Sequence, residues 1–567
     1  LLFGSSAIGG VVNVIDSRIP RRAPEGGVHF DGVAGYGSAA NERSAGGRLD
    51  LGLGSNFVLH ADGTYSKSGN LDTGGFILAP ALRSEAASSD EPEIQELSAL
   101  KGKIPNSAAR TWEIAGGLAW IGSNAQFGAS ISRFDSLYGV PVRYATTEEG
   151  EEEETEDARV KGELGEGPEE VRLDVKQTRY DVRGEVSPET GFLDAVRFRG
   201  GHADYKHNEL EDTGEIGTTF TSKGTEARLE LVQRERNGWK GAIGAQYYDR
   251  SLNIVGEEKF LPRNKTRQFG IFTVQSFDLG AFRAEAGGRV EFTRQRADAD
   301  ADLGTLAARR SFTAVSGSMG GAYEIATGVR IGINASYSQR APSAEELFSN
   351  GPHAGTQAFE IGNPNFGKEK STGLELTLRA DTGPFKLSGS LYQSWFKGFI
   401  YEQPDGTEQD DLPVFTFLQD DARYFGAELE AEAEVAKIGD ATISIDLVTD
   451  FTRAKIKVPG PDSNAPRIPA FRFLNGVSVE AEKWGVRAEV ERVTGQNKIA
   501  AFETRTPGYT LVNASVTLRP FGPDTDATLV LSANNIFDVT ARRHASFLKD
   551  YSPLAGRDIR VALQFGF

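Results

Sequence analysis

Six histidines are the side chains of this 567-residue sequence best suited to bind a transition metal, because the chain has no cysteine. His353 lies in a stretch rich in Pro, Gly, Asn and Ser, from Ala341 to Gly367, between two segments with alternating apolar residues. This pattern predicts a strand, a long loop and a second strand. His202 and His207 stand where another predicted strand leads into the segment HNELEDTGE. Imidazole and carboxylate are the ligands expected for Zn²⁺ without thiolates, yet a lone loop histidine is more often an ordinary surface residue.

A second candidate for cation chemistry is an acidic stretch between residues 148 and 170. Twelve acidic residues and two basic ones give it a net charge of −10, more than half of the chain's −18. One interpretation is a solvated, disordered loop; the other is an electrostatic lure that concentrates cations. Carboxylates alone prefer hard ions such as Ca²⁺ and Mg²⁺, so the stretch could gather divalent metal without selecting zinc. The cation-attracting residues are Glu148, Glu149, Glu151, Glu152, Glu153, Glu154, Glu156 and Asp157.

Other function classes find little support in the sequence. The chain contains no GxSxG, HExxH or P-loop pattern, so we expect no enzyme. A net charge of −18 argues against binding nucleic acid through its phosphates. No apolar run approaches the roughly 18 residues of a membrane helix.

Alternation of apolar and polar residues runs through the whole chain. Leu374, Leu376 and Leu378 alternate with polar residues, and the chain closes on an alternating segment that ends at Phe567. A soluble antiparallel sheet with one wet face is the simpler interpretation. A pattern repeated over more than about 500 residues instead favours a transmembrane β-barrel, with the apolar face toward lipid and the polar face toward the lumen. We therefore predict an all-β fold, in which His29 and His60 are wall residues.

The connections between the predicted strands alternate in length, which is typical of outer-membrane barrels with long loops outside the cell. Short turns are predicted at segments such as SPETG and DTGP. Long polar loops are predicted at Gly69–Ala109, Pro141–Gln177, His202–Lys223, Ala297–Arg310, Ala341–Lys370, Tyr401–Asp421, Ala454–Arg467 and Asn497–Thr506.

The first residues, FGSSAIGGVVNVID from Phe3 to Asp16, resemble the end of the plug domain of TonB-dependent receptors. The resemblance implies a buried strand at Val11–Ile15. It assigns residues 1–20 to the C-terminal remnant of a plug and residues 21–567 to the barrel. A plug holds on the order of a hundred residues (a domain-sized unit), so we expect an N-terminally truncated fragment whose missing part carries the TonB box.

Several stretches resemble the zinc-uptake (ZnuD-type) branch of these receptors: SLYGVPV, QTRYDVRGE, DYKHNE, RAPSAEELF, FEIGNPNFGKEKS, APRIPAFR, GQNKIAAFETRTPGY, NNIFD and HASFLKD. The resemblance implies a 22-stranded barrel in the outer membrane of a Gram-negative bacterium. It implies a monomer that takes up zinc with the TonB–ExbB–ExbD complex and needs no cofactor. A barrel glutamate and a loop histidine of that branch map onto Glu209 and His353. His207, two residues before Glu209, is a further candidate metal ligand by its residue type. Both Glu209 and His353 are expected on extracellular loops, over the plug.

Two alternatives remain open. Receptors for haem, siderophores or other metal chelates share the plug and barrel, and the segment FEIGNPN is close to a pattern of haem receptors. The acidic stretch also lacks the histidines that the zinc receptors often carry there, which weakens the preference for zinc. A passive porin or an adhesive barrel is the alternative of a different class, and the plug-like segment argues against it.

Overall fold

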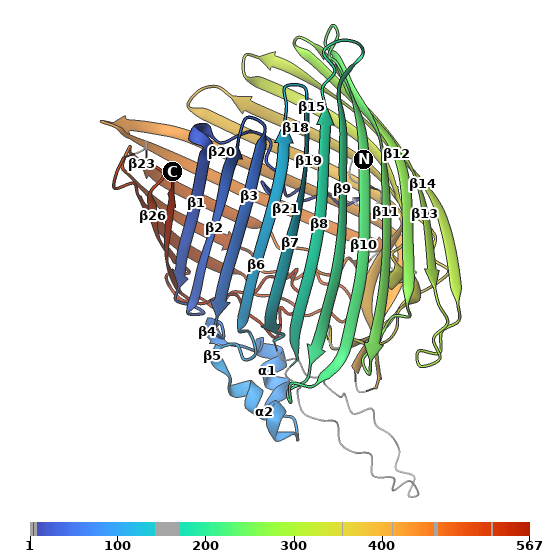
Figure 1. The fold of residues 1–567 in the computed structure, drawn as a ribbon. Coiled ribbons are helices and arrows are strands. Elements are labelled where there is room, and N and C mark those ends of the chain that lie inside the picture. The colour runs from blue at the N-terminus through green and yellow to red at the C-terminus, as the bar shows by residue number, and fades with distance from the viewer. Residues whose placement is uncertain are drawn as a thin grey trace, which may run out of the picture.

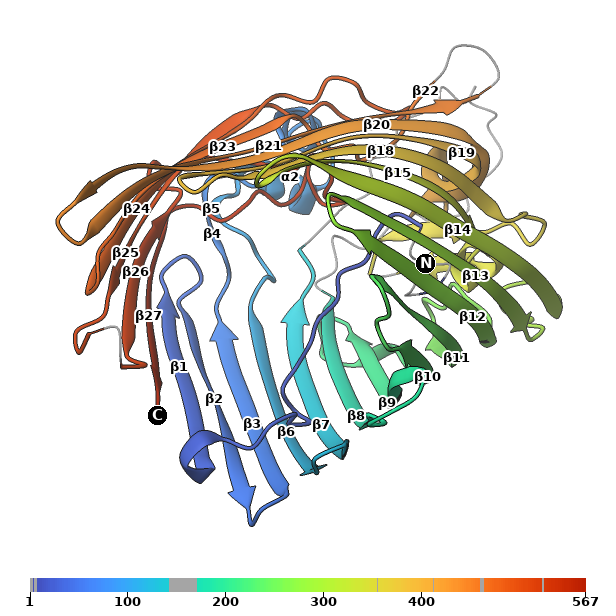
Figure 2. The same cartoon turned by 90° about the horizontal axis from the view of Figure 1, so that it is seen from above.

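The computed structural model describes residue 4 and residues 8–141, 171–353, 355–410, 412–458, 463–522 and 525–567. In this part of the chain, 22 antiparallel strands form a closed barrel (Figures 1 and 2). They are β1 (Val28–Gly37), β2 (Glu42–Leu53), β3 (Phe57–Ser68), β6 (Ala109–Ile121), β7 (Ala125–Gly139), β8 (Arg172–Val186), β9 (Leu193–Leu210), β10 (Ile216–Gln233), β11 (Trp239–Gly256), β12 (Asn264–Leu279), β13 (Phe282–Ala297), β14 (Ala308–Ala326), β15 (Val329–Arg340), β18 (Glu369–Asp381), β19 (Phe385–Gln409), β20 (Leu412–Ile438), β21 (Ala441–Lys457), β23 (Arg472–Glu480), β24 (Trp484–Val493), β25 (Tyr509–Leu518), β26 (Thr528–Asn534) and β27 (Asp558–Gly566).

Each barrel strand pairs with the next, and β1 pairs with β27 to close the ring. The last residue takes part in the closure, because Phe567 and Phe30 exchange two backbone hydrogen bonds of 3.0 Å. Their rings stack with centroids 5.4 Å apart. Closure leaves no strand edge unpaired, as a sheet surrounded by lipid requires.

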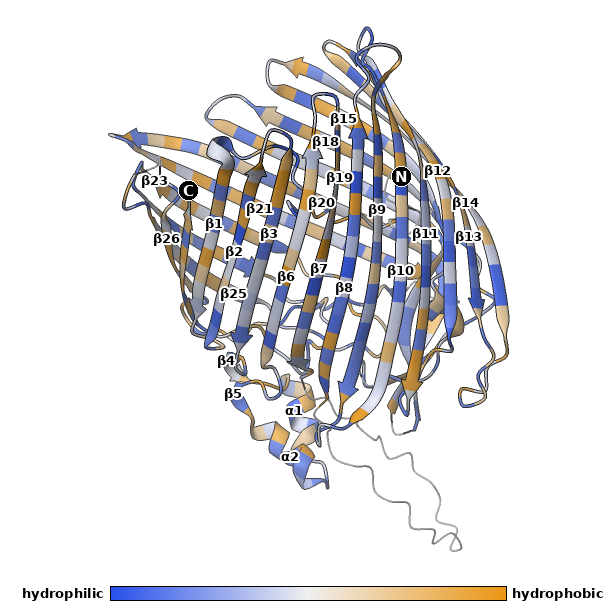
Figure 3. Ribbon diagram, viewed as in Figure 1, coloured by the Kyte–Doolittle hydropathy of each residue, from blue (hydrophilic) through white to orange (hydrophobic). Residues whose placement is uncertain are grey.

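The wall is inverted relative to a soluble protein, since its apolar side chains point outward. Leu374, Leu376 and Leu378 of β18 are 41%, 49% and 37% exposed on the outer face. Figure 3 shows the alternation of hydrophobic and hydrophilic positions along each strand. Charged side chains such as Arg487 and Asp446 face the lumen and pair there, with their nearest atoms 2.5 Å apart. The predicted all-β membrane barrel is confirmed. Of the described helices, none has the length and apolar character needed to cross a membrane.

Short turns join the strands at one end of the barrel, the inner rim, and the long connections lie at the other end, the outer rim (Figure 1). The outer rim carries the small elements β4 (Asp72–Phe76), α1 (Pro80–Ala86), α2 (Pro92–Ala99), β5 (Lys101–Lys103), α3 (Ala344–Phe348), β16 (Asn350–His353), β17 (Ala358–Ile361) and β22 (Ser463–Asn464).

Two of the predicted long loops are wrong. Within His202–Lys223, strand β9 continues to Leu210 and β10 begins at Ile216; within Tyr401–Asp421, β19 and β20 are separated by only residues 410 and 411. The physical reason is that these strands extend beyond the lipid. There lipid no longer imposes an apolar outer face, and side chains such as Phe220 and Phe415 are buried at the outer rim, so the strict alternation ends while inter-strand hydrogen bonding goes on.

The N-terminal segment enters the lumen, crosses it and reaches β1 through the short helix η1 (Glu25–Gly27) (Figure 2). The expected buried strand at Val11–Ile15 is wrong for this structure, because these residues form no strand and Val12 is 92% exposed. A strand needs a pairing partner, and no described strand lies beside this segment. Residues just downstream are fixed to the wall: Arg18 forms ion pairs with Asp62 (3.3 Å) and Glu113 (2.7 Å).

His29 and His60 lie in β1 and β3, as predicted for wall residues. The ring of His60 is fully buried between two carboxylates, with Nδ1 2.7 Å from Asp50 and Nε2 2.9 Å from Asp62. Both nitrogens of this imidazole therefore have a carboxylate partner within the wall, which leaves neither available to a ligand.

Candidate metal site

The candidate site lies at the outer rim, where the ends of β9, β10 and β11 meet the connection between β15 and β18. The site's floor is a buried apolar cluster that includes Phe220, Phe260, Leu261 and Leu347. Helix α3 begins with a capping box, because the Ser343 hydroxyl accepts from the Glu346 amide and the Glu346 carboxylate accepts from the Ser343 amide.

Buried ion pairs hold this connection to the wall. Arg340, at the end of β15, bonds Glu346 in α3 (2.9 Å) and Glu369 in β18 (2.8 Å). The backbone amide of Asn350 donates to the Phe260 carbonyl at 2.8 Å, so β16 is held against the connection between β11 and β12. The hairpin formed by β16 and β17 is thereby placed over the end of β9.

His353, the last residue of β16, has one ring nitrogen committed and the other directed at β9. Its Nδ1 lies 2.8 Å from Glu360 Oε1 in β17, and the hydroxyl of Thr356 also donates to this oxygen (2.9 Å). A side-chain carbon at Gly355 would lie 3.2 Å from His353 Nε2 and 3.5 Å from Glu209 Oε1. Both atoms therefore lie near the same point beside Gly355.

Glu209, the penultimate residue of β9, is 3% exposed, and its Oε2 has no hydrogen-bond partner. It lies on a strand end rather than on the predicted loop. The outward neighbours Asp204 and Lys206 are ionic, so this part of β9 extends beyond the lipid. Burial raises the pKa of Glu209 to about 7, although the charge of His353 opposes the rise. A buried carboxylate without a partner costs free energy unless it binds a proton or a cation.

The pKa of His353 is raised. Burial lowers it, but the hydrogen bond that the ring donates to Glu360 and the negative charges of Glu360, Glu209 and Glu258 outweigh that effect. Both shifts favour the protonated forms of the two groups. Deprotonated imidazole and carboxylate are the forms that bind zinc, so ion binding and proton release are coupled.

His207 belongs to an aromatic cluster beside the site. Its ring stacks on Phe220 at 4.1 Å, His353 stacks on Phe260 at 4.0 Å, and the two phenyl rings are 6.2 Å apart. The hydroxyl of Tyr205 lies 3.0 Å from His207 Nδ1. Burial, with the nearby charge of His353, lowers the pKa of His207 to about 4, which keeps this imidazole neutral.

Two further carboxylates at the site were missed in the sequence. Glu360 belongs to the quoted FEIGN motif, but only the pairing of His353 with Ala358 across the hairpin brings it to Nδ1. Glu258 follows β11, and its amide bonds the hydroxyl of Thr218, the cross-strand partner of Glu209. Among the described residues no three His, Asp or Glu are already gathered as a metal cage. The pair thus forms an open half-site.

The acidic residues from Glu148 to Asp157, predicted to attract cations, lie outside the described residues.

The family model described as "TonB dependent receptor-like, beta-barrel" matches residues 122–536, most of the chain. The chain belongs to this family. TonB-dependent receptors are outer-membrane receptors and transporters that work with TonB, and they are not enzymes. Family membership therefore decides against the porin and adhesin alternatives.

Solved structures of such receptors share the fold. The copper transporter OprC has a TM-score of 0.76 and 15% identity, over 95% of this chain and 80% of its own. The FrpB iron transporter from Neisseria meningitidis (F3-3 variant) has a TM-score of 0.70 and 13% identity, over 95% and 81%. The haemophore receptor HasR from Serratia marcescens, solved with its haemophore and haem, has a TM-score of 0.68 and 13% identity, over 96% and 81%.

Proposed function

We propose that this TonB-dependent receptor captures a divalent metal ion, zinc, between Glu209 Oε1 and His353 Nε2 and delivers it to an energy-driven uptake step powered by TonB, ExbB and ExbD. The observation that carries the proposal is the carboxylate–imidazole pair. Glu360 accepts a hydrogen bond from Nδ1 of His353, so Nε2 remains for a metal ion, and the nearby carboxylate of Glu209 is buried with one oxygen, Oε2, that has no hydrogen-bond partner. A carboxylate behind a ligating histidine fixes the ring and strengthens it as a ligand, and such outer partners accompany most histidine metal sites.

The donor set favours zinc over hard cations. One imidazole and one carboxylate suit Zn²⁺, whereas Ca²⁺ prefers six or more oxygens. The two remaining positions of a tetrahedral ion are open to water and to residues of the plug. Copper also binds imidazole, so the affinities of the receptor for zinc and for copper must be compared.

Capture of haem or another flat chelate is supported less well. Phe220 and Phe260, the aromatic rings nearest to His353, are only 6% and 5% exposed because the two imidazoles stack on them. A macrocycle would need an exposed aromatic face, which these rings do not offer. A small ion needs no such face and can bind through Glu209 and His353 alone.

Zinc titration of the purified receptor, with zinc binding followed by calorimetry, tests the proposal. His353→Ala and Glu209→Gln should each weaken zinc binding at least about tenfold, since each removes one of about four ligands. His202→Ala is the matched control, because His202 also lies in β9 but bonds Thr225 on the outward side. Unchanged affinity in both site variants would exclude this site, and tighter binding of copper than of zinc would assign it to copper.

A further inference from the structure

The outward face of β12 and β13 changes from apolar to basic side chains near the outer rim. Ile271 lies opposite Val290, and Phe269 lies opposite Phe292 in the next outward-facing row. All four side chains are well exposed on the outer face. Aromatic residues are typical of the level at which a membrane barrel leaves the hydrocarbon of the bilayer. The Phe269–Phe292 row therefore marks the border between the acyl chains and the head groups.

The next two outward rows are entirely basic. Arg267 lies opposite Arg294, and Lys265 lies opposite Arg296. On its other side, Arg296 lies opposite Arg309 of β14. We call these five residues the rim basic patch. Like charges directly opposite each other on a sheet destabilise it. Their repetition in two successive rows indicates that an external anion compensates them.

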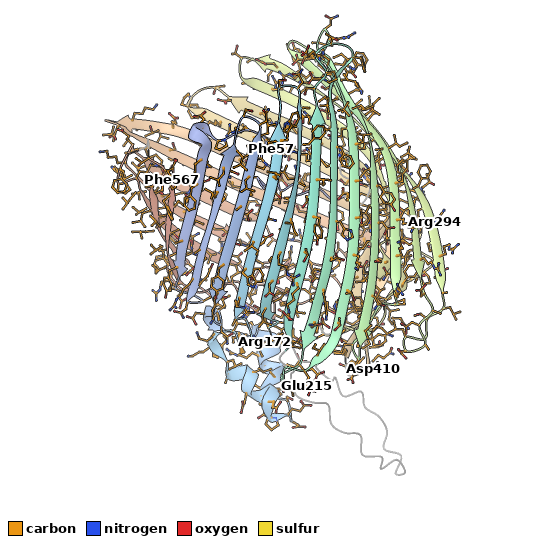
Figure 4. All side chains as sticks on the ribbon, viewed as in Figure 1. Phe57, Arg172, Glu215, Arg294, Asp410 and Phe567 are labelled. Carbon is orange, nitrogen blue, oxygen red and sulfur yellow. The ribbon has the colours of Figure 1, made fainter. Side chains whose placement is uncertain are left out.

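Carboxylates of the protein compensate the patch only in part. Lys265 and Arg267 share Asp249, at 3.1 and 2.8 Å, and Arg296 approaches Asp298 at 3.6 Å. Arg294 and Arg309 have no carboxylate within ion-pair distance among the described residues. Figure 4 labels Arg294 on the outer side of the wall. Five cations thus face two carboxylates, on a chain whose net charge is −18.

The same arrangement recurs elsewhere around the barrel. Trp395 is exposed on the outer face of β19, and in the next outward row Lys397 lies opposite Lys370. On β8 and β9, Lys176 lies opposite Lys206, two rows beyond the exposed Tyr180; here Lys176 pairs with Asp174 at 2.8 Å, and Asp204 lies in the row between. The basic pairs therefore follow a level above the aromatic residues and not one particular strand. A level of this kind indicates a planar layer of anions around the barrel.

We propose that the rim basic patch binds the phosphate groups of the lipid that forms the outer leaflet around the receptor. Successive outward-facing residues of a strand are about 7 Å apart, so the two basic rows reach the head-group layer directly above the aromatic row. Guanidinium groups match phosphate oxygens in a bidentate manner, and four of the five cations are arginines. Phosphate removes the repulsion between the paired arginines, and the lipid in turn fixes the β12–β14 wall next to the metal site.

Binding of a bis-phosphorylated glucosamine lipid to the full chain in zwitterionic detergent, measured by native mass spectrometry, tests the proposal. The dephosphorylated form of this lipid and inorganic phosphate are the comparison ligands. The double variant Arg294→Gln/Arg296→Gln should weaken binding of the phosphorylated lipid at least about tenfold. Arg283→Gln is the matched control, because Arg283 is an exposed arginine of the same strand at the inner rim. The double variant with lysine at both positions keeps the charge and should keep most of the binding.

Each outcome is decisive provided that the barrel remains folded, which its heat-dependent electrophoretic mobility reports. Preference for the phosphorylated lipid, lost in the glutamine variant and kept in the Arg283 control, supports the proposal. Equal binding of the dephosphorylated lipid overturns it, as does displacement of the lipid by inorganic phosphate. Equal loss in the Arg283 control also overturns it, because binding would then follow overall charge. None of these outcomes depends on whether zinc binds at Glu209 and His353.

Discussion

Zinc capture at Glu209 and His353 should depend steeply on pH. Without metal the pKa of Glu209 is raised to about 7, so about half of the Glu209 carboxyl groups hold a proton at pH 7, and the pKa of His353 is also raised. Zinc must displace these protons to bind. The affinity for zinc therefore rises as pH rises through these pKa values, and it levels off once both groups are deprotonated.

The magnitude follows from the proton count. With a pKa of about 7, Glu209 alone reduces zinc affinity about tenfold between pH 8 and pH 6, because its deprotonated fraction falls from about nine tenths to about one tenth. His353 steepens this fall, since its own pKa is raised above the ordinary value. The two groups titrate as a coupled pair, so their joint slope is the quantity to compare with experiment.

Calorimetric titration with zinc in two buffers of different ionisation enthalpy measures the protons released. We expect release of at least half a proton at pH 7, and less in Glu209→Gln, in which no proton can leave position 209. The affinity of that variant should also depend less on pH between 6 and 8. Zinc binding without proton release, or an unchanged pH dependence in Glu209→Gln, would refute the assignment of Glu209 as a ligand.

Three further outcomes follow from the same contacts. Glu360→Gln should weaken zinc binding about 10- to 100-fold by calorimetry, because it removes the partner that orients His353, while the barrel's thermal unfolding stays unchanged. Arg340→Met leaves the buried Glu369 without its ion pair and should cost about 3 kcal/mol, seen as faster proteolysis of the connection between β15 and β18; equal cleavage rates would contradict this. Deletion of residues 148–170 should slow zinc association at low ionic strength and leave the equilibrium affinity nearly intact; a slowing that persists at high salt would argue against the lure.

The barrel was largely predictable because lipid on one side of the wall and water on the other require apolar and polar residues to alternate along each strand. The segment that ends at Phe567 shows this pattern in the sequence and forms strand β27 up to Gly566, beside β1. Where the strands leave the lipid the constraint ends, and Tyr401–Asp421 was accordingly mistaken for a loop although it continues β19 and β20. Val11–Ile15 has the apolar composition of a buried strand, but strand formation depends on a partner that composition does not reveal.

Of the candidate site, only the two proposed ligands were predicted from the sequence. The resemblance to zinc receptors located Glu209 and His353, and the fold brings them together across 144 residues of sequence. Glu360 was missed because nothing distinguishes it among the 80 acidic residues until the hairpin pairs β16 with β17. His207 was selected for its residue type, but its stacking on Phe220 is a tertiary property.

X-ray absorption at the zinc edge, on the zinc-loaded receptor, tests the central claim most directly. The account predicts one imidazole nitrogen and at least one carboxylate oxygen at about 2.0–2.2 Å from the metal. It also predicts that His353→Ala removes the imidazole signal, whereas His202→Ala keeps it. A zinc spectrum without imidazole, or one that is the same in His353→Ala as in the unmodified receptor, would contradict the account.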